Sequence, residues 1–244
     1  MLALVSCGGG GGGGAGNPCS DLNLKVTGGT QCKFERSPVV AILSLNSDGS
    51  VGLCTGTMVT VNDVLTAAHC FKPNLIDVTV FVDQTAFQIT NGAIHPGYNG
   101  QVGSPFDLAM LTIEGVLDIG PVPLILSDLS LVDEQITVYG YGSDEEGLSG
   151  LQEGPSAFKA GRMGIARMSP GLFDADFDET GSAICQGDSG GPATQTINGI
   201  TGIVGVTSFT VGGCTSGSVS GFVNIQYPEI HGFITGYAPD VAIR

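Results

Sequence analysis

Leu65-Thr66-Ala67-Ala68-His69-Cys70 is the first of three short stretches that decide the fold of this chain. The second is Asp107-Leu108-Ala109-Met110-Leu111, and the third is Gly187-Asp188-Ser189-Gly190-Gly191-Pro192. A serine hydroxyl is a poor nucleophile until a base takes its proton, and histidine is the usual base. The three stretches therefore predict a catalytic group of His69, Asp107 and Ser189, assembled from distant parts of the chain.

The composition around these stretches is that of a β protein. The 244 residues include 40 glycines and are 42% hydrophobic, which favours short strands and tight turns. Apolar runs separated by turn residues predict strands at 39–45, 58–65, 77–82, 108–113, 136–141, 200–206 and 221–225. Asn198-Gly199 carries the signal of a tight hairpin, and the tail from Pro228 is the only helix we expect.

The charge is strongly negative and narrows the range of partners. The chain has 23 acidic and 8 basic side chains, which gives a formal net charge of −15. Such a surface repels phosphate backbones, so we expect no nucleic-acid partner. We interpret the acidity as a property that favours solubility. No stretch reaches the roughly 18 apolar residues that span a bilayer.

The N-terminus carries a possible lipid attachment motif. Leu4-Val5-Ser6-Cys7 resembles a bacterial lipobox, and residues 8–14 are an unbroken glycine run that predicts a flexible tether. The chain has 7 cysteines, and an odd count leaves one with a separate role. Residues 1–18 are therefore interpreted as a leader and tether, with Cys7 as a lipidation site. The alternative is a free cysteine. A membrane would be contacted only through such an anchor.

The order His, Asp, Ser resembles that of the trypsin/chymotrypsin family of serine proteases, and the resemblance extends from about residue 26 to the C-terminus. It implies an all-β domain of two six-stranded antiparallel β-barrels with the active site between them and a short C-terminal helix. Barrel one would cover about 26–120 and barrel two about 121–244. The implied activity is peptide-bond hydrolysis through an acyl-enzyme.

The resemblance also implies a role for each site residue. His69 would be the general base, Asp107 would orient it, and the N–H groups of Gly187 and Ser189 would form the oxyanion hole. The implied disulfides are Cys54–Cys70 and Cys185–Cys214. The segment between the histidine and the aspartate has no acidic cluster like the family's calcium loop, so we expect no metal, and we expect no cofactor. The partners would be polypeptide substrates of a monomeric enzyme.

The specificity pocket predicted from the resemblance is apolar. Ala183 stands six residues before the nucleophile, where trypsin-like members carry an aspartate, and Ile184 adds apolar bulk. Thr210 and Gly221 are placed on the pocket walls, with the alignment at Gly221 open by one residue. Thr207-Ser208-Phe209-Thr210 matches the strand that pairs with the substrate backbone. We expect a small or medium apolar P1 residue. The alternative is a chymotrypsin-like preference for larger side chains.

Lys25-Val26-Thr27-Gly28-Gly29 resembles the family's activation site. Residues 19–25 would then be a propeptide, removed by a separate trypsin-like protease that cuts after Lys25. The new amine of Val26 would pair with Asp188. Cysteine parity suggests a disulfide between Cys19 and Cys32, although both could be free thiols.

Two readings of the whole protein remain open from the sequence. One is a secreted or periplasmic serine endopeptidase, made as a zymogen and tethered to a bacterial membrane if Cys7 is lipidated. The other is a catalytically silent member of the same fold that serves as a binding or adhesion module. The intact set of His69, Asp107, Ser189 and Gly187 favours the enzyme.

Overall fold

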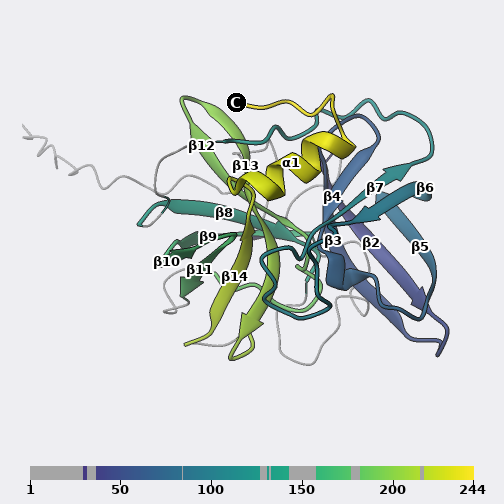
Figure 1. The fold of residues 1–244 in the computed structure, drawn as a ribbon, viewed down its shortest axis with the longest axis horizontal. Coiled ribbons are helices and arrows are strands. Elements are labelled where there is room, and N and C mark those ends of the chain that lie inside the picture. The colour runs from purple at the N-terminus through teal and green to yellow at the C-terminus, as the bar shows by residue number, and fades with distance from the viewer. Residues whose placement is uncertain are drawn as a thin grey trace, which may run out of the picture.

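The computed structural model describes residues 30–31, 37–83, 85–126, 131, 133–142, 158–176, 182–214 and 217–244. It is mostly β and has two units that lie side by side, with one helix across their junction (Figure 1). The activation residues Lys25 and Val26, together with Cys7, Cys19 and Cys32, lie outside the described residues.

The first unit is a closed six-stranded antiparallel barrel. Its strands follow the order β2-β3-β4-β7-β6-β5. Alternate apolar side chains such as Val40, Ile42, Val64 and Val80 point inward and form its core. The strands are β2 (Val39–Asn46), β3 (Val51–Met58), β4 (Asp63–Thr66), β5 (Leu75–Val82), β6 (Thr85–Ile94) and β7 (Ala109–Ile113).

The second unit is a curled sheet in the order β1-β9-β8-β12-β13-β14-β11-β10. The expected all-β, two-unit fold is confirmed. Among the described residues this sheet has eight strands rather than six, since the short strands β1 and β10 extend its two edges. The strands are β1 (Thr30–Gln31), β8 (Gln135–Gly140), β9 (Lys159–Gly164), β10 (Arg167–Ser169), β11 (Leu172–Asp176), β12 (Pro192–Ile197), β13 (Ile200–Val211) and β14 (Val219–Asn224).

The predicted C-terminal helix is present as α1 (Pro228–Tyr237), with a proline in its first turn. Its buried residues Ile230 and Ile234 belong to a core cluster that also contains Leu65 and Met110 of the first barrel and Val206 of the second sheet. None of the described helices has the length and apolar character needed to cross a bilayer. The helix therefore buries apolar surface from both units and holds them together.

The local predictions are confirmed at one turn and wrong at another. Asn198 and Gly199 both have positive φ, 53° and 79°, in the tight turn between β12 and β13, as an Asn-Gly hairpin requires. The predicted strand 58–65 is broken, because residues between β3 and β4 form a turn. The Thr60 hydroxyl accepts from the N–H of Asp63 at 2.9 Å and closes that turn.

Candidate active site

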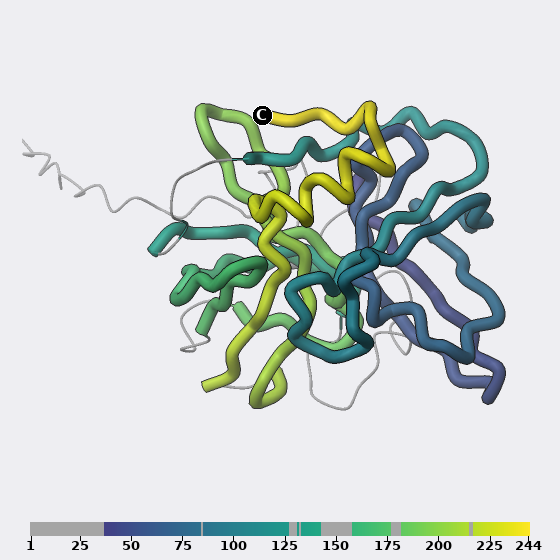
Figure 2. Tube along the Cα trace, viewed as in Figure 1, coloured from purple at the N-terminus to yellow at the C-terminus, as the bar shows by residue number. Residues whose placement is uncertain are grey.

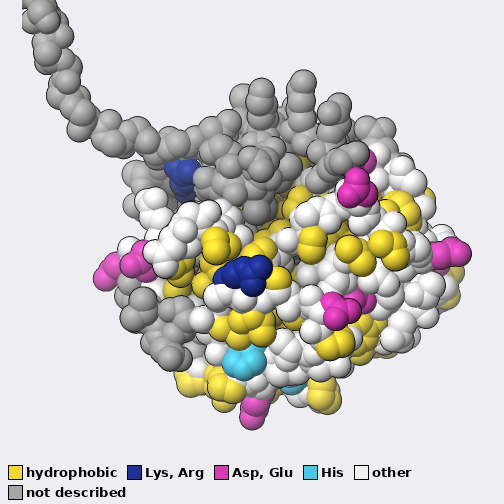
Figure 3. All heavy atoms as spheres, turned by 90° about the horizontal axis from the view of Figure 1, so that it is seen from above, with side chains coloured by type: hydrophobic (Ala, Val, Ile, Leu, Met, Phe, Trp, Pro, Cys, Tyr) yellow, Lys and Arg dark blue, Asp and Glu magenta, His cyan; other side chains and the backbone are white. Residues whose placement is uncertain are grey.

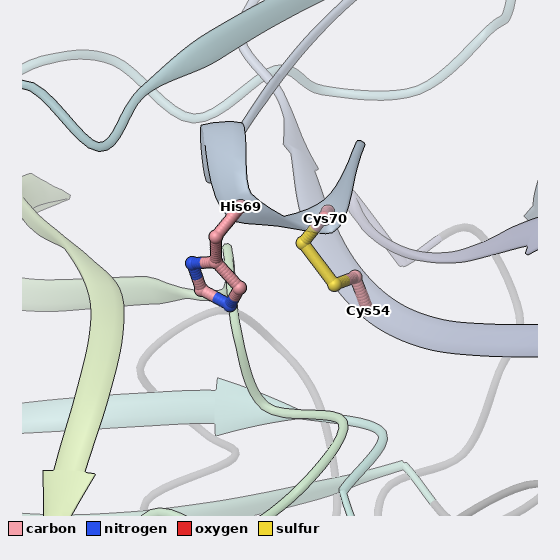
Figure 4. A group of neighbouring side chains, drawn as sticks. All are labelled: Cys54, His69 and Cys70. Carbon is pink, nitrogen blue, oxygen red and sulfur yellow. A yellow bond between two sulfur atoms is a disulfide. The ribbon is translucent and has the colours of Figure 1, made fainter. Parts of the chain in front are cut away.

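A buried aspartate orients the histidine at the junction of the two units. His69 lies in the short helix η2 (Ala68–Cys70), beside a disulfide (Figure 4). Its Nδ1 is 2.7 Å from Oδ2 of Asp107, and its backbone N–H donates to Oδ1 at 2.8 Å. Because the carboxylate accepts the Nδ1 proton, the Nε2 atom carries the lone pair that can act as a base.

The carboxylate of Asp107 is fully buried and satisfied by three donors. The third donor is the hydroxyl of Ser208, which lies 2.6 Å from Oδ2. A β-bulge between Thr207 and Phe209 leaves Ser208 without a cross-strand partner in β13, which turns its side chain toward the aspartate. Burial, and secondly the negative charge of Asp107, raise the pKa of the nearby Tyr98, so its phenol stays neutral beside this carboxylate.

The loop that carries Ser189 leaves two backbone donors open. The N–H of Asp188 donates to Cys185 O, and the N–H of Gly190 donates to Thr207 O. The alternate N–H groups, those of Gly187 and Ser189, have no acceptor within the described residues. Gly187 has φ +100°, a conformation that a side chain would strain. These two unpaired N–H groups, two residues apart in the turn, are available to an anionic ligand.

Contacts from the first barrel place this loop next to His69. The carbonyl of Ser189 accepts from the N–H of Thr55 at 2.8 Å and lies 3.9 Å from Sγ of Cys70, the residue that follows the histidine. A side chain at Gly190 would not fit, because its Cβ would lie under 3.0 Å from Thr66 Oγ1 and Thr55 O. In the backbone trace of Figure 2 the teal loop that precedes β7 lies between the two units.

The carboxylate of Asp188 is also held in place. Its Oδ1 accepts from the N–H of Gly142 and its Oδ2 from the N–H of Cys185, each at 2.8 Å. A Cβ at Gly140 or Gly142 would lie under 3.0 Å from this carboxylate, so both positions must stay small. The predicted pairing with Val26 falls outside the described residues.

The residues proposed for the pocket walls lie where β13 and β14 pair, and the register of the two strands is defined. Thr210 is opposite Ser220, whereas Gly221 is opposite Phe209 and would carry a Cβ under 3.0 Å from that ring. Residues opposite each other share one face of a sheet, so Gly221 faces the Phe209 side and not the Thr210 side. Ser220 lies on the Thr210 side, and the parity of the strand pairing is the signal that identifies it.

Ser220 connects β14 to the segment before Ser189. It is fully buried, and its hydroxyl lies 3.4 Å from the N–H of Ile184, from which it accepts. Ile184 is itself buried, and Ala183 beside it is partly exposed. Ala183, Ile184, Thr210 and Ser220 carry no charge, so this part of the site offers no counterion for a basic side chain.

Two disulfides brace the site, with the pairings that the family resemblance implied. Cys54 is joined to Cys70, and Cys185 is joined to Cys214. Cys54, His69 and Cys70 also bring three potential metal-ligand atoms within 4.8 Å of one another. Both sulfur atoms are bonded to each other, however, and a disulfide does not offer the thiolates that a metal needs.

The fold is that of the two-unit serine proteases. A family model described as Trypsin matches residues 26–230, and the chain belongs to that family. A trypsin from Saccharopolyspora erythraea is 30% identical over 205 residues, which cover 77% of this chain and 87% of the relative. Chymotrypsin-like elastase family member 1 from Macaca fascicularis is 27% identical over 217 residues, which cover 78% and 80%. Coagulation factor XI from Bos taurus is 26% identical over 222 residues, and the match spans only 35% of that protein.

Proposed function

We propose that this protein is a serine endopeptidase in which Ser189 attacks the peptide carbonyl. The observation that carries the proposal is the Asp107–His69 pair, whose geometry leaves Nε2 as a base at the junction where the Ser189 loop docks. His69 takes the hydroxyl proton, and the carbonyl carbon becomes bonded to the serine oxygen. The negative charge on the former carbonyl oxygen is stabilised by the N–H groups of Gly187 and Ser189.

Collapse of the tetrahedral intermediate breaks the peptide bond. The proton held by His69 passes to the leaving amine, and an acyl-enzyme remains on Ser189. Water then attacks the ester with the same histidine as base, and release of the carboxylic acid restores the hydroxyl. Asp107 stays ionised and stabilises the imidazolium in both halves.

The P1 preference that we propose is for small or medium apolar side chains. Peptide substrates with P1 Ala, Val or Leu should show kcat/KM values at least about 100-fold above those with P1 Arg or Lys, because a buried cation would have no partner. A peptide library varied only at P1 measures this directly and also tests for turnover. Preference for Phe or Tyr would support the chymotrypsin-like alternative.

A pocket variant provides the matched test of that assignment. Ala183→Asp supplies a carboxylate at the proposed base of the pocket, so the kcat/KM for P1 Lys should rise relative to that for P1 Ala. A wild-type preference for basic P1 residues, or no change of the ratio in the variant, would show that Ala183 does not line the pocket.

We also propose that the enzyme is made as a zymogen that cannot activate itself. Activation would require cleavage after Lys25, and the pocket lacks an acid to receive lysine. Purified precursor should stay intact on incubation and gain activity after treatment with trace trypsin. Rapid cutting after Lys25 in precursor alone, absent from Ser189→Ala, would contradict this.

The proposed disulfide between Cys19 and Cys32 is tested on the cut protein. On a non-reducing gel the cut propeptide should stay attached if Cys19 and Cys32 are bonded, and it should separate only with reductant.

The proposed location is outside the cytoplasm. The two described disulfides are stable in an oxidising compartment. Lipidation of Cys7 would tether the protease to a membrane surface through the glycine run. On the face drawn in Figure 3 the basic side chains are few and separated, which agrees with the acidic composition.

The second candidate function is a catalytically silent binding module of the same fold. Such a protein would show neither turnover nor labelling by a serine-reactive probe.

A further inference from the structure

We propose that Thr55 is a positioning residue for the oxyanion hole, a role that rests on the proposed peptidase function. Thr55 lies on β3 of the first barrel and is fully buried. Its hydroxyl donates to the carbonyl of Gly187 at 2.8 Å, across the junction between the two units. A side chain of one unit therefore holds the backbone of the loop that would form the anion site in the other.

The direction of this hydrogen bond is fixed by a second one. The N–H of Tyr141 donates to the same hydroxyl oxygen at 3.0 Å. A hydroxyl has one proton and accepts through its lone pairs, so with Tyr141 as donor its own proton goes to Gly187 O. Tyr141 is buried as well, so both bonds are made away from water, where an unmade bond is costly.

Gly187 depends on backbone contacts for its position, and the Thr55 bond adds to the one that the N–H of Asp188 makes to Cys185 O. It has no side chain to pack, and at φ +100° it occupies a region open mainly to glycine. Its N–H, one of the two open donors, has no partner among the described residues. That N–H and the carbonyl bonded to Thr55 belong to the two peptide units on either side of the Gly187 Cα. The contact therefore fixes the position of this residue in the loop, and a displacement of Gly187 from the site must break a buried hydrogen bond.

The backbone of Thr55 anchors the peptide unit that follows the second donor. Its N–H donates to the carbonyl of Ser189 at 2.8 Å. Its own carbonyl accepts from the hydroxyl of Thr66 at 2.7 Å, which fixes the strand at that point. Thr55 thus contacts the carbonyl groups of both residues whose N–H groups face the proposed oxyanion. Of these contacts, a substitution can remove the one that the Thr55 hydroxyl makes to the carbonyl of Gly187.

The test compares Thr55→Val with Thr55→Ser. The valine has nearly the same shape but no hydroxyl, and the serine keeps the hydroxyl. Removing an oxyanion-hole donor lowers kcat by about 100- to 1000-fold, and loosening one should cost less, about 10- to 100-fold, with KM little changed. Thr55→Ser should retain most of the wild-type kcat.

A spectroscopic readout separates positioning from general loosening. A peptidyl trifluoromethyl ketone with a ¹³C-labelled carbonyl forms a hemiketal with the serine, and the ¹³C shift follows ionisation of its hydroxyl. In Thr55→Val this ionisation should move to higher pH, by about one pH unit for each tenfold loss of oxyanion stabilisation. Thr194→Val is the matched control, because Thr194 is also buried and its hydroxyl donates to a backbone carbonyl, that of Thr137, at 3.1 Å.

The outcomes are distinct. Lower kcat and a higher ionisation pH in Thr55→Val, with both near wild type in Thr55→Ser and Thr194→Val, support the proposal. Wild-type values in Thr55→Val, or equal losses in Thr194→Val, overturn it and leave the peptidase assignment intact. Failure of the wild-type protein to form the hemiketal overturns both. If Thr55→Val does not fold, Thr55→Cys, whose thiol is a weak donor, takes its place with the same expectations.

Discussion

Ser189→Ala should lower kcat for peptide hydrolysis by about 10⁵- to 10⁶-fold, since it removes the hydroxyl that we propose forms the acyl-enzyme. The substitution removes one oxygen atom from a partly exposed side chain, so the melting temperature should change little. The measurement is steady-state hydrolysis of an apolar-P1 peptide by activated protein. Variant and wild type are prepared in the same way.

Ser44→Ala is the matched control for that experiment. Ser44 is buried in β2 of the first barrel and takes no part in the site. This variant should keep wild-type kcat and KM. A Ser189→Ala protein that retains more than a few per cent of the activity would show that another residue is the nucleophile.

Asp107→Asn should lower kcat by about 10⁴-fold, the loss expected when a triad histidine is held in the wrong tautomer. The aspartate accepts from the His69 N–H, from His69 Nδ1 and from the Ser208 hydroxyl. An amide can match these donors with only its oxygen, and its NH₂ group then faces donors. The histidine is pushed toward the tautomer that carries the proton on Nε2, where it cannot act as a base.

Asp63→Asn separates this effect from a loss of stability. Asp63 accepts from the hydroxyls of Thr60 and Thr112, at 2.8 and 2.7 Å, and lies outside the site. The Asp63→Asn substitution should lower the melting temperature, because it weakens these hydrogen bonds, and should leave kcat unchanged. If Asp107→Asn reduced kcat no more than Asp63→Asn does, Asp107 would have no catalytic role.

The candidate catalytic residues could be proposed from the sequence because they sit in short contiguous motifs. The stretches around His69 and Ser189 contain both the reactive residue types and the small residues that shape the backbone beside them. The order of these motifs along the chain indicates the fold. The β7 and β14 strands were found within two residues at each end from their apolar runs. A run of apolar residues bounded by turn residues is enough to predict such strands from the sequence.

The strands that were missed lack a run of large apolar residues. The β3 strand buries its second half, but that half is mostly small or polar (Cys54-Thr55-Gly56-Thr57). The β6 strand, Thr85–Ile94, is largely exposed and polar, so it has no apolar run to mark it. The role of Ser208 depends on a bulge, which is set by pairing between β13 and β14 and not by local sequence. Ser220 and Thr55 were missed for a related reason, since their partners are 36 and 132 residues away.

The most direct test of the central claim is to find where a serine-reactive probe bonds. The activated protein is treated with a fluorophosphonate, digested and mapped by mass spectrometry. The account predicts one adduct per chain, on the peptide that contains Ser189, formed slowly or not at all in Asp107→Asn and absent from Ser189→Ala. No adduct on the activated wild-type protein, or an adduct that persists in Ser189→Ala, would contradict it.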